Sequence, residues 1–203
     1  CTVYSGGRRN VIPAVRITTQ SGIMTSDVLS EEFSRRRIYI TGIISDEMAA
    51  DVCAQINYLA SLNNDDDIWL IIQSTGGSVP AGCAILDTMT SCDCDINTLV
   101  VGEAASMAAI IASAGTKGKR YIGENAEMMI HQAMGGASGQ TVDIIRSADH
   151  IKKVNQKLYR LLCQNTGKSY AQIQSDCDRD SYFNSKEAIG YGLVDKIFDG
   201  FDE

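Results

Sequence analysis

The sequence predicts one α/β domain built on a mainly parallel sheet and preceded by a polar arm. The run at residues 68–72 is continuously apolar rather than alternating, which is typical of a strand buried on both faces of a parallel sheet, and residues 96–101 are expected to form a second buried strand. Segments with helical spacing of their apolar residues alternate with these runs, as in other α/β folds. A chain of 203 residues is long enough for one domain with a substantial core.

The arm comprises residues 1–30, which are polar and irregular and include the pair Gly6-Gly7. We expect one short strand within it, at residues 15–18. The periodic pattern begins near Glu31, so we place the single domain at residues 31–203.

The expected strands are short apolar runs. They lie at residues 38–40, 68–72, 96–101, 120–122, 128–130 and 193–198. The pair Gly76-Gly77 is expected to turn the chain after the second of these strands.

Ser45 is expected to cap the first helix, because apolar residues then recur at helical spacing. These residues are Met48, Val52, Ile56 and Leu59. Ser78 and Pro80 are expected to open the second helix. The remaining helices are expected at residues 104–114, at 141–164 as the longest, after Ser169 with Gln172 as a capping box, and around 186–190.

Composition limits the class of protein. The net charge is −7, and the two basic clusters, at residues 35–37 and 117–120, are short, so we expect no nucleic-acid partner and read the clusters as solvated or as ion pairs between subunits. The seven cysteines include no C-x-x-C pair, and Cys92-Asp93-Cys94 is too tight for the usual zinc spacing, so we expect no metal and a reducing compartment. The sequence contains no run of about 18 apolar residues, so we expect no membrane span.

Two residues stand where chemistry is usual in such folds. Ser106 follows a buried strand near the start of a helix, where backbone N–H groups are free to bind an anion. His131 ends another apolar strand, whereas the second histidine, His150, is expected to be exposed on a helix. A serine and a histidine together indicate nucleophilic catalysis if a carboxylate orients the imidazole.

The residues alone leave that carboxylate open. Asp176, Asp178, Asp180 and Asp195 all follow His131 in the sequence. Gly76-Gly77 could direct an N–H toward a ligand or form a plain turn. No P-loop pattern occurs, so we expect no ATPase in this chain.

Several motifs together resemble the proteolytic subunit of the Clp protease (the ClpP family). They are Ser74-Thr75-Gly76-Gly77, Gly102-Glu103-Ala104-Ala105-Ser106-Met107-Ala108, Met129-Ile130-His131-Gln132 and Asp178-Arg179-Asp180. The resemblance runs from about residue 37 to 198, with the motifs in order.

The resemblance implies a crotonase-like fold with a protruding handle helix and a Ser-His-Asp triad. Its nucleophile would be Ser106, its base His131 and its orienting acid Asp180. The N–H groups of Gly77 and Met107 would form the oxyanion hole, and Asp178 and Arg179 would couple ring contacts to the alignment of the site.

The resemblance also implies a machine around this chain. It would be a serine endopeptidase in a homo- or hetero-oligomer of two stacked heptameric rings, fed with unfolded protein by an AAA+ unfoldase that consumes the ATP, with no cofactor in this chain. The arm would be an axial loop, and the location the bacterial-type cytoplasm or an organelle stroma or matrix.

Some positions depart from the family pattern. Alanine stands at position 133, where proline is common, and Ala108 replaces the usual glycine. Residues 1–36 do not follow the usual family sequence. An alternative reading is therefore a poorly active structural or regulatory ring subunit that needs a sister subunit. A crotonase-fold enzyme acting on acyl-CoA is a third reading.

Overall fold

A computed structural model describes residues 13–19 and 22–201 of the chain. The chain divides into two compact units, Cys1–Arg37 and Ile38–Glu203, which are described separately below. No helix in the described residues is long and apolar enough to cross a bilayer.

The first unit contains a hairpin followed by a short helix. Strand β1 (Ala14–Thr19) pairs antiparallel with β2 (Gly22–Asp27), and α1 (Val28–Ser34) follows. Asp27 caps α1, since its Oδ1 accepts a hydrogen bond from the Ser30 N–H at 3.0 Å. The strand predicted at 15–18 lies within β1, but its partner β2 was not expected, and the Gly6-Gly7 pair lies outside the described residues.

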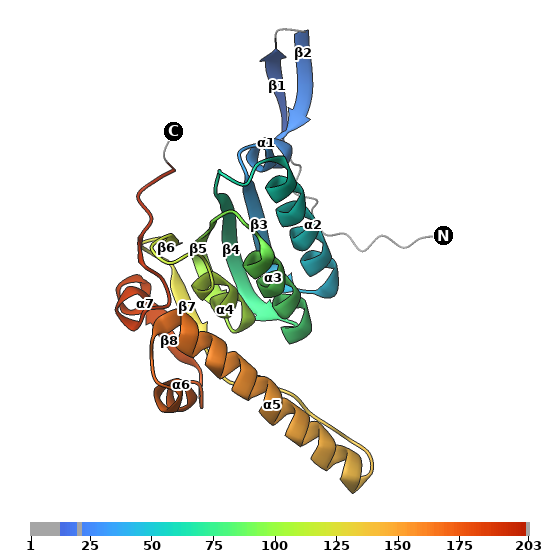
Figure 1. Ribbon diagram of the computed structural model, residues 1–203, viewed down its shortest axis with the longest axis vertical. Coiled ribbons are helices and arrows are strands. Elements are labelled where there is room, and N and C mark those ends of the chain that lie inside the picture. Colours follow the sequence, from blue (N-terminus) through green and yellow to red (C-terminus); the bar gives the residue numbers. More distant parts are fainter. Residues whose placement is uncertain (1–12, 20–21, 202–203) are drawn as a thin grey trace. The chain divides into compact units, whose positions relative to one another are not determined.

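The second unit is built on a sheet whose described strands follow the order β3-β4-β5-β6-β9, with β7 paired to β5 and β8 to β7 (Figure 1). The strands are β3 (Arg37–Ile44), β4 (Ile68–Gly77), β5 (Ile96–Ala105), β6 (Arg120–Ile122), β7 (Glu127–Ile130), β8 (Ser181–Asn184) and β9 (Lys196–Ile197). The β4/β5, β5/β6, β5/β7 and β6/β9 pairs are parallel and the β7/β8 pair is antiparallel. The predicted mainly parallel sheet is confirmed.

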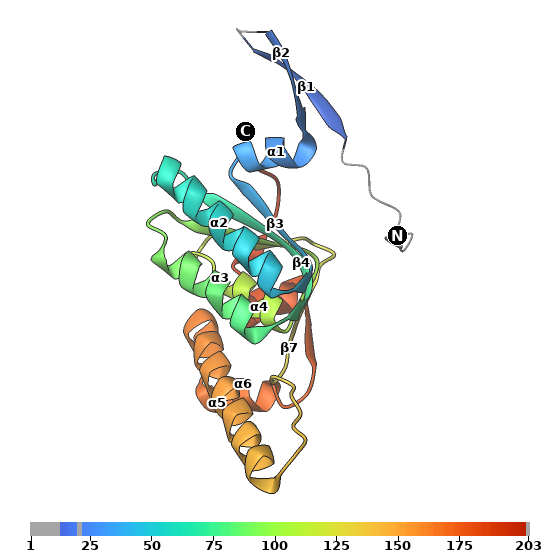
Figure 2. The same cartoon turned by 90° about the vertical axis from the view of Figure 1, so that its right-hand side faces the viewer.

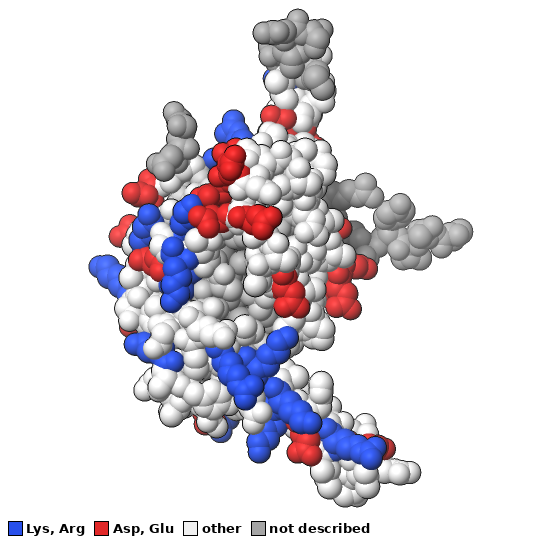
Figure 3. Space-filling model, in the orientation of Figure 1, with Lys and Arg blue, Asp and Glu red and all other residues white. Residues whose placement is uncertain are grey.

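Helices pack against the sheet, and one of them extends away from it. They are α2 (Asp46–Leu62), α3 (Val79–Ser91), α4 (Met107–Ser113), α5 (Thr141–Thr166), α6 (Tyr170–Asp176) and α7 (Ser185–Tyr191). Helices α2, α3 and α4 lie on one face of the sheet, while α5 extends away from the body of this unit as the predicted handle (Figures 1 and 2). Basic side chains follow α5 on the face seen in Figure 3.

The helix signals in the sequence act largely as predicted. Ser45 caps α2 and Ser78 caps α3 through their side chains, and α5 ends at Gly167, whose φ of 76° is left-handed. Ser169 also caps α6, but Gln172 bonds Asp176 instead of completing a capping box. The reciprocal capping box is instead formed at the start of α7.

Two predicted boundaries are wrong. Ala104 and Ala105 belong to β5 rather than to a helix, because they pair in parallel register with Met128 and Met129 of β7. Gly76 and Gly77 likewise continue β4 instead of turning the chain. For the two alanines, pairing with β7 supplies backbone partners that outweigh the helix propensity of alanine. The Gly76 N–H donates to the Ser74 side-chain oxygen at 3.0 Å within the same strand.

The second basic cluster, at residues 117–120, includes one buried residue, Arg120. The Arg120 side chain is 4% exposed and forms an ion pair with Asp195, with 2.5 Å between Nη2 and Oδ1. Its Nη1 donates to the carbonyl oxygens of Ser113, Asn165 and Gly192. Arg120 thus joins β6 to the ends of α4, α5 and α7, contrary to the expectation of solvated or intersubunit charges.

The environment of Asp195 favours its charged form. Burial alone would raise the pKa of this carboxyl, but the hydrogen bonds and charge of Arg120, with the Gly118 N–H, outweigh burial and hold the pKa below its ordinary value. Because the pKa is lower in the folded chain than in the unfolded one, the resulting stabilisation is present above about pH 4 and is lost as the pH falls through the folded-state pKa.

We predict that Arg120→Ala lowers the free energy of unfolding by about 3 kcal/mol at neutral pH, because it removes the buried guanidinium that pairs with the half-buried Asp195 carboxylate and donates to three carbonyls. Urea denaturation at one protein concentration measures this. Lys119→Ala is the control: Lys119 bridges Asp67 and Asp95 with its side chain 36% exposed, and should cost less than about 1 kcal/mol. Equal losses, or an Arg120 effect that does not shrink below pH 4, would contradict this account.

Candidate active site

Ser106 lies in a strained turn between β5 and α4. Its φ of 56° and ψ of −122° are unusual for a residue with a side chain, and Arg36 is the other described non-glycine residue with positive φ. The Ser106 N–H donates to the Met129 carbonyl at 2.8 Å, which fixes the turn to β7. A sharp strand-to-helix turn of this kind presents a serine hydroxyl at the edge of a sheet, as in nucleophile elbows.

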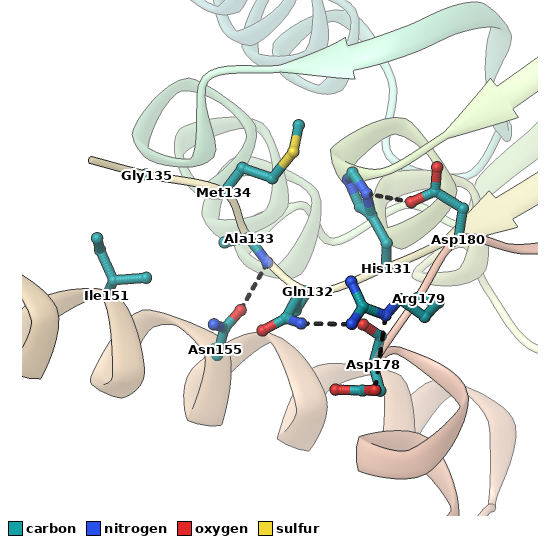
Figure 4. Close-up of a pocket in the computed structure, with 10 residues that line it drawn as sticks. All are labelled: His131, Gln132, Ala133, Met134, Gly135, Ile151, Asn155, Asp178, Arg179 and Asp180. Carbon is teal, nitrogen blue, oxygen red and sulfur yellow. Dashed lines mark hydrogen bonds and ion pairs between the residues drawn. The ribbon is translucent and has the colours of Figure 1, made fainter.

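His131 follows the last residue of β7 and faces this hydroxyl. Its Nε2 lies 2.8 Å from Ser106 Oγ, and its side chain is 12% exposed. On the other side of the ring, Nδ1 lies 3.0 Å from Asp180 Oδ1, an interaction drawn in Figure 4. Both distances are within hydrogen-bond reach, so a proton can pass between hydroxyl and imidazole.

The structure distinguishes among the four aspartates that the residues left open. Asp176 accepts from the Tyr191 hydroxyl at 2.6 Å, and Asp195 pairs with Arg120. Of the four aspartates, Asp180 is the one whose carboxylate contacts the imidazole of His131. Its carboxylate comes from the turn before β8, and its side chain is 56% exposed.

A groove of about 330 Å³ lies beside Ser106 and His131. It is lined by Ile43, Thr75, Gly76, Gly77, Val79, Ser106, His131, Ala133 and Met134. Met107 is the first residue of α4, so its N–H has no acceptor within the helix and is available for a ligand. Of the two residues expected to form an oxyanion hole, Gly77 lines the groove and Met107 follows the groove residue Ser106 in sequence.

The backbone of Gly76 packs closely against the turn at Ser106. Its φ is 90°, and a Cβ added there would lie 2.7 Å from the Ala105 carbonyl oxygen and 2.8 Å from the Ser106 Cβ. Real Cβ atoms do not approach backbone so closely, so only glycine lets β4 pass this near the serine.

A larger open pocket of about 840 Å³ adjoins the other side of His131 (Figure 4). Asp178 and Arg179 lie at its rim, next to Asp180 in sequence, with 3.9 Å between Asp178 Oδ2 and Arg179 Nε. The two side chains are 72% and 92% exposed, so the pair is loose within a single chain.

Sequence reasoning missed two residues that hold the segment after His131. The Gln132 N–H donates to the Cys177 carbonyl at 2.8 Å, and its Nε2 donates to the Asp178 carbonyl at 3.0 Å. The Ala133 N–H donates to Asn155 Oδ1 at 2.6 Å. Gln132 could have been suspected beside His131, but nothing in the sequence singles out Asn155 within a long helix.

Cys177 lies under the Asp180 turn but is no rival nucleophile. Burial raises the pKa of its thiol to about 12, so the thiol stays neutral. A thiol attacks only as its thiolate, which leaves Ser106 as the nucleophile candidate of this site.

Comparison with known proteins identifies the family. The sequence model of the family described as "Clp protease" matches residues 20–200, and the chain belongs to this family of peptidases. The chain is 43% identical over 191 residues to the "ATP-dependent Clp protease proteolytic subunit" of Streptococcus pyogenes serotype M5 (strain Manfredo), covering 93% of this chain and 97% of that protein. The proteins of the same name from serotypes M49 (strain NZ131) and M1 match equally well. The observed α/β fold is consistent with this family.

We predict that Gly76→Ala lowers the free energy of unfolding by about 3 kcal/mol, because a positive φ and a clash with the Ser106 turn act together. Gly42→Ala is a matched control: its φ is 83°, but a Cβ there would meet no atom within 4 Å, so only the conformational cost of about 1 kcal/mol remains. Urea denaturation of both variants tests the difference. Equal effects would show that contact with Ser106 is not what excludes a side chain at Gly76.

Proposed function

We propose that this chain is a serine endopeptidase subunit of an ATP-dependent protein-degradation machine, hydrolysing unfolded polypeptides to short peptides. The observation that carries the proposal is the continuous chain of contacts from Ser106 Oγ through the His131 imidazole to the Asp180 carboxylate, at 2.8 and 3.0 Å. Membership of the Clp protease family supports it.

In this mechanism His131 Nε2 takes the proton of Ser106 as Oγ attacks the carbonyl carbon of the peptide. Asp180 holds the tautomer with the proton on Nδ1 and stabilises the imidazolium that forms. The imidazolium then gives its proton to the leaving amine, and an acyl-enzyme ester remains on Ser106. Water, deprotonated by the same imidazole, hydrolyses the ester and regenerates the serine.

The groove supplies the rest of the chemistry from the backbone. The N–H groups of Gly77 and Met107 would stabilise the oxyanion, and the N-terminal end of α4 contributes in the same sense. No metal or cofactor of this chain enters any step, and ATP would be consumed only by the partner.

The proposed assembly is a homo- or hetero-oligomer of two stacked heptameric rings with the sites inside, as expected from the family. The handle α5 supports it, because Val142, Ile144 and Ile145 near its start are 57%, 41% and 56% exposed. Asp178 and Arg179 would link ring contacts to Asp180. The curated relatives are named as ATP-dependent, which supports an AAA+ unfoldase partner that delivers unfolded protein. The proposed location is the bacterial-type cytoplasm, or an organelle stroma or matrix.

One observation favours the alternative of a poorly active ring subunit that needs a sister. Asp180 is 56% exposed and follows the exposed Asp178 and Arg179, so its alignment in the assembly depends on what covers this turn. A sister subunit could supply that cover. Peptide turnover by the pure homo-oligomer, compared with turnover after adding a sister subunit, separates the two functions.

We predict that a fluorophosphonate labels Ser106 covalently in the assembled protein, since the probe needs an activated serine and an oxyanion site. Ser106→Ala should abolish labelling. His131→Ala should lower peptide turnover at least about a thousandfold, because the base is lost. His150→Ala is the matched control and should leave turnover unchanged, since His150 is exposed on α5. An unlabelled Ser106 in an intact assembly that also lacks peptide turnover would refute the proposal.

A further inference from the structure

The segment after His131 is fastened on two sides. On one side, Gln132 bonds the carbonyls of Cys177 and Asp178, which lead to Asp180. On the other, the Ala133 N–H bonds Asn155 Oδ1, 22 residues further along the chain in α5 (Figure 4). His131 therefore precedes a stretch whose backbone is held between the Asp180 turn and the handle helix.

The handle approaches this stretch closely at a second point. A Cβ added at Gly135 would lie 2.7 Å from Ile151 Cδ1, one helical turn before Asn155. Asn155 is half-buried. Its Oδ1 accepts the hydrogen bond from Ala133 that links α5 to residues 132–135. The two contacts set the path of this stretch against α5.

We propose that Asn155 is a positioning residue for the proposed peptidase reaction: its amide oxygen anchors the Ala133 N–H and so keeps the His131 imidazole between Ser106 and Asp180. The proposal rests on the proposed function. Its physical basis is that His131 sits two residues before the anchor, so a shift of Ala133 moves the imidazole relative to a serine that is itself fixed to β7 through Met129. Without the acceptor, a half-buried N–H must find another partner.

The experiment compares Asn155→Leu, which keeps the size but removes the acceptor, with Asn155→Asp, which keeps an acceptor oxygen. The rate of Ser106 labelling by a small fluorophosphonate is the readout, because it reports the activated serine without the peptide groove that Ala133 and Met134 also line. We expect labelling to slow roughly fivefold in Asn155→Leu and to stay near the parent rate in Asn155→Asp. Native mass confirms that both variants assemble alike.

A second background tests whether the hydrogen bond itself matters. Ala133→Pro has no N–H at this position, so Asn155→Leu should change its labelling rate less than about twofold. A fivefold loss in this background too, or no loss in the parent background, would overturn the role assigned to Asn155.

The failure of this inference and of the proposed function can be told apart. If the assembled parent protein is not labelled and also lacks peptide turnover, the peptidase proposal fails. Amide hydrogen exchange at Ala133 then still reports the anchor, since Asn155→Leu should speed that exchange while Asn155→Asp should not. Labelling in the parent that Asn155→Leu leaves unchanged refutes the positioning role alone.

A separate observation concerns two thiols at the C-terminal end of α3. Cys92 is the C-cap of α3, and Cys94 lies just before β5 with 6% of its surface exposed. The turn between the two elements brings their sulfur atoms to 2.9 Å, closer than two sulfur atoms not bonded to each other usually approach. Neither cysteine forms a disulfide, and Cys92 is the more accessible of the two.

We infer that Cys92 and Cys94 form a reversible dithiol–disulfide site that exchanges with low-molecular-weight disulfides. The Cys92 thiolate would attack the small disulfide and release one small thiol. The Cys94 thiolate would then attack Cys92 Sγ and release the second, so that two protein thiols are oxidised and one small disulfide is reduced. A ring closed across one intervening residue is strained, so the disulfide should be readily reduced rather than structural.

Titration of the folded protein with reduced and oxidised glutathione tests this, followed by acid quench, alkylation and peptide mass mapping. At oxidising ratios the peptide carrying Cys92 and Cys94 should lose two hydrogen atoms and resist alkylation, and dithiothreitol should reverse both changes. Cys94→Ser should instead retain glutathione on Cys92, while Cys177→Ser should behave as the parent. Full alkylation at the most oxidising ratio, or a stable mixed disulfide in the parent, would overturn the site.

Discussion

The backbone turn at Ser106 is the constraint on which the site depends. The residue adopts a φ of 56° that a side chain normally avoids, and three neighbours keep it there. Met129 accepts its N–H, α4 starts directly after it, and Gly76 leaves room where a Cβ would collide. A conformation costing on the order of 1–3 kcal/mol persists only where the surroundings fix it so closely.

The parallel sheet explains why residues so distant in sequence meet. Strands β4, β5 and β7 are neighbours running in one direction, so their C-terminal ends lie at the same edge. That edge brings together Gly77, Ser106 and His131. Asp180 arrives differently, from the turn before the antiparallel β8, whose pairing with β7 carries it back to the imidazole.

The sequence predicts what depends on local pattern, and less of what depends on pairing between distant segments. Caps at Ser45 and Ser78, the long helix and the buried strands follow from spacing and cap chemistry. The assignment of Ala104 and Ala105 failed because their partners lie on β7, more than twenty residues away. For the same reason the residues alone pointed to Ser106 and His131 but could not choose among four aspartates, a choice that family resemblance made and that distances now support.

Within the single chain, Ser106 and His131 are held in place more firmly than Asp180, the third residue of the proposed triad. Ser106 and His131 are held by buried strands and main-chain hydrogen bonds, and the imidazole is 12% exposed. Asp180 sits on an exposed turn held to its surroundings by the Gln132 contacts and by Ser181, whose hydroxyl bonds the Asp176 carbonyl at 2.6 Å. Contacts made by a neighbouring subunit on Asp178 and Arg179 would therefore act on the carboxylate before they could disturb the nucleophile. A peptidase arranged in this way can be switched through its orienting acid while its strained serine turn remains intact.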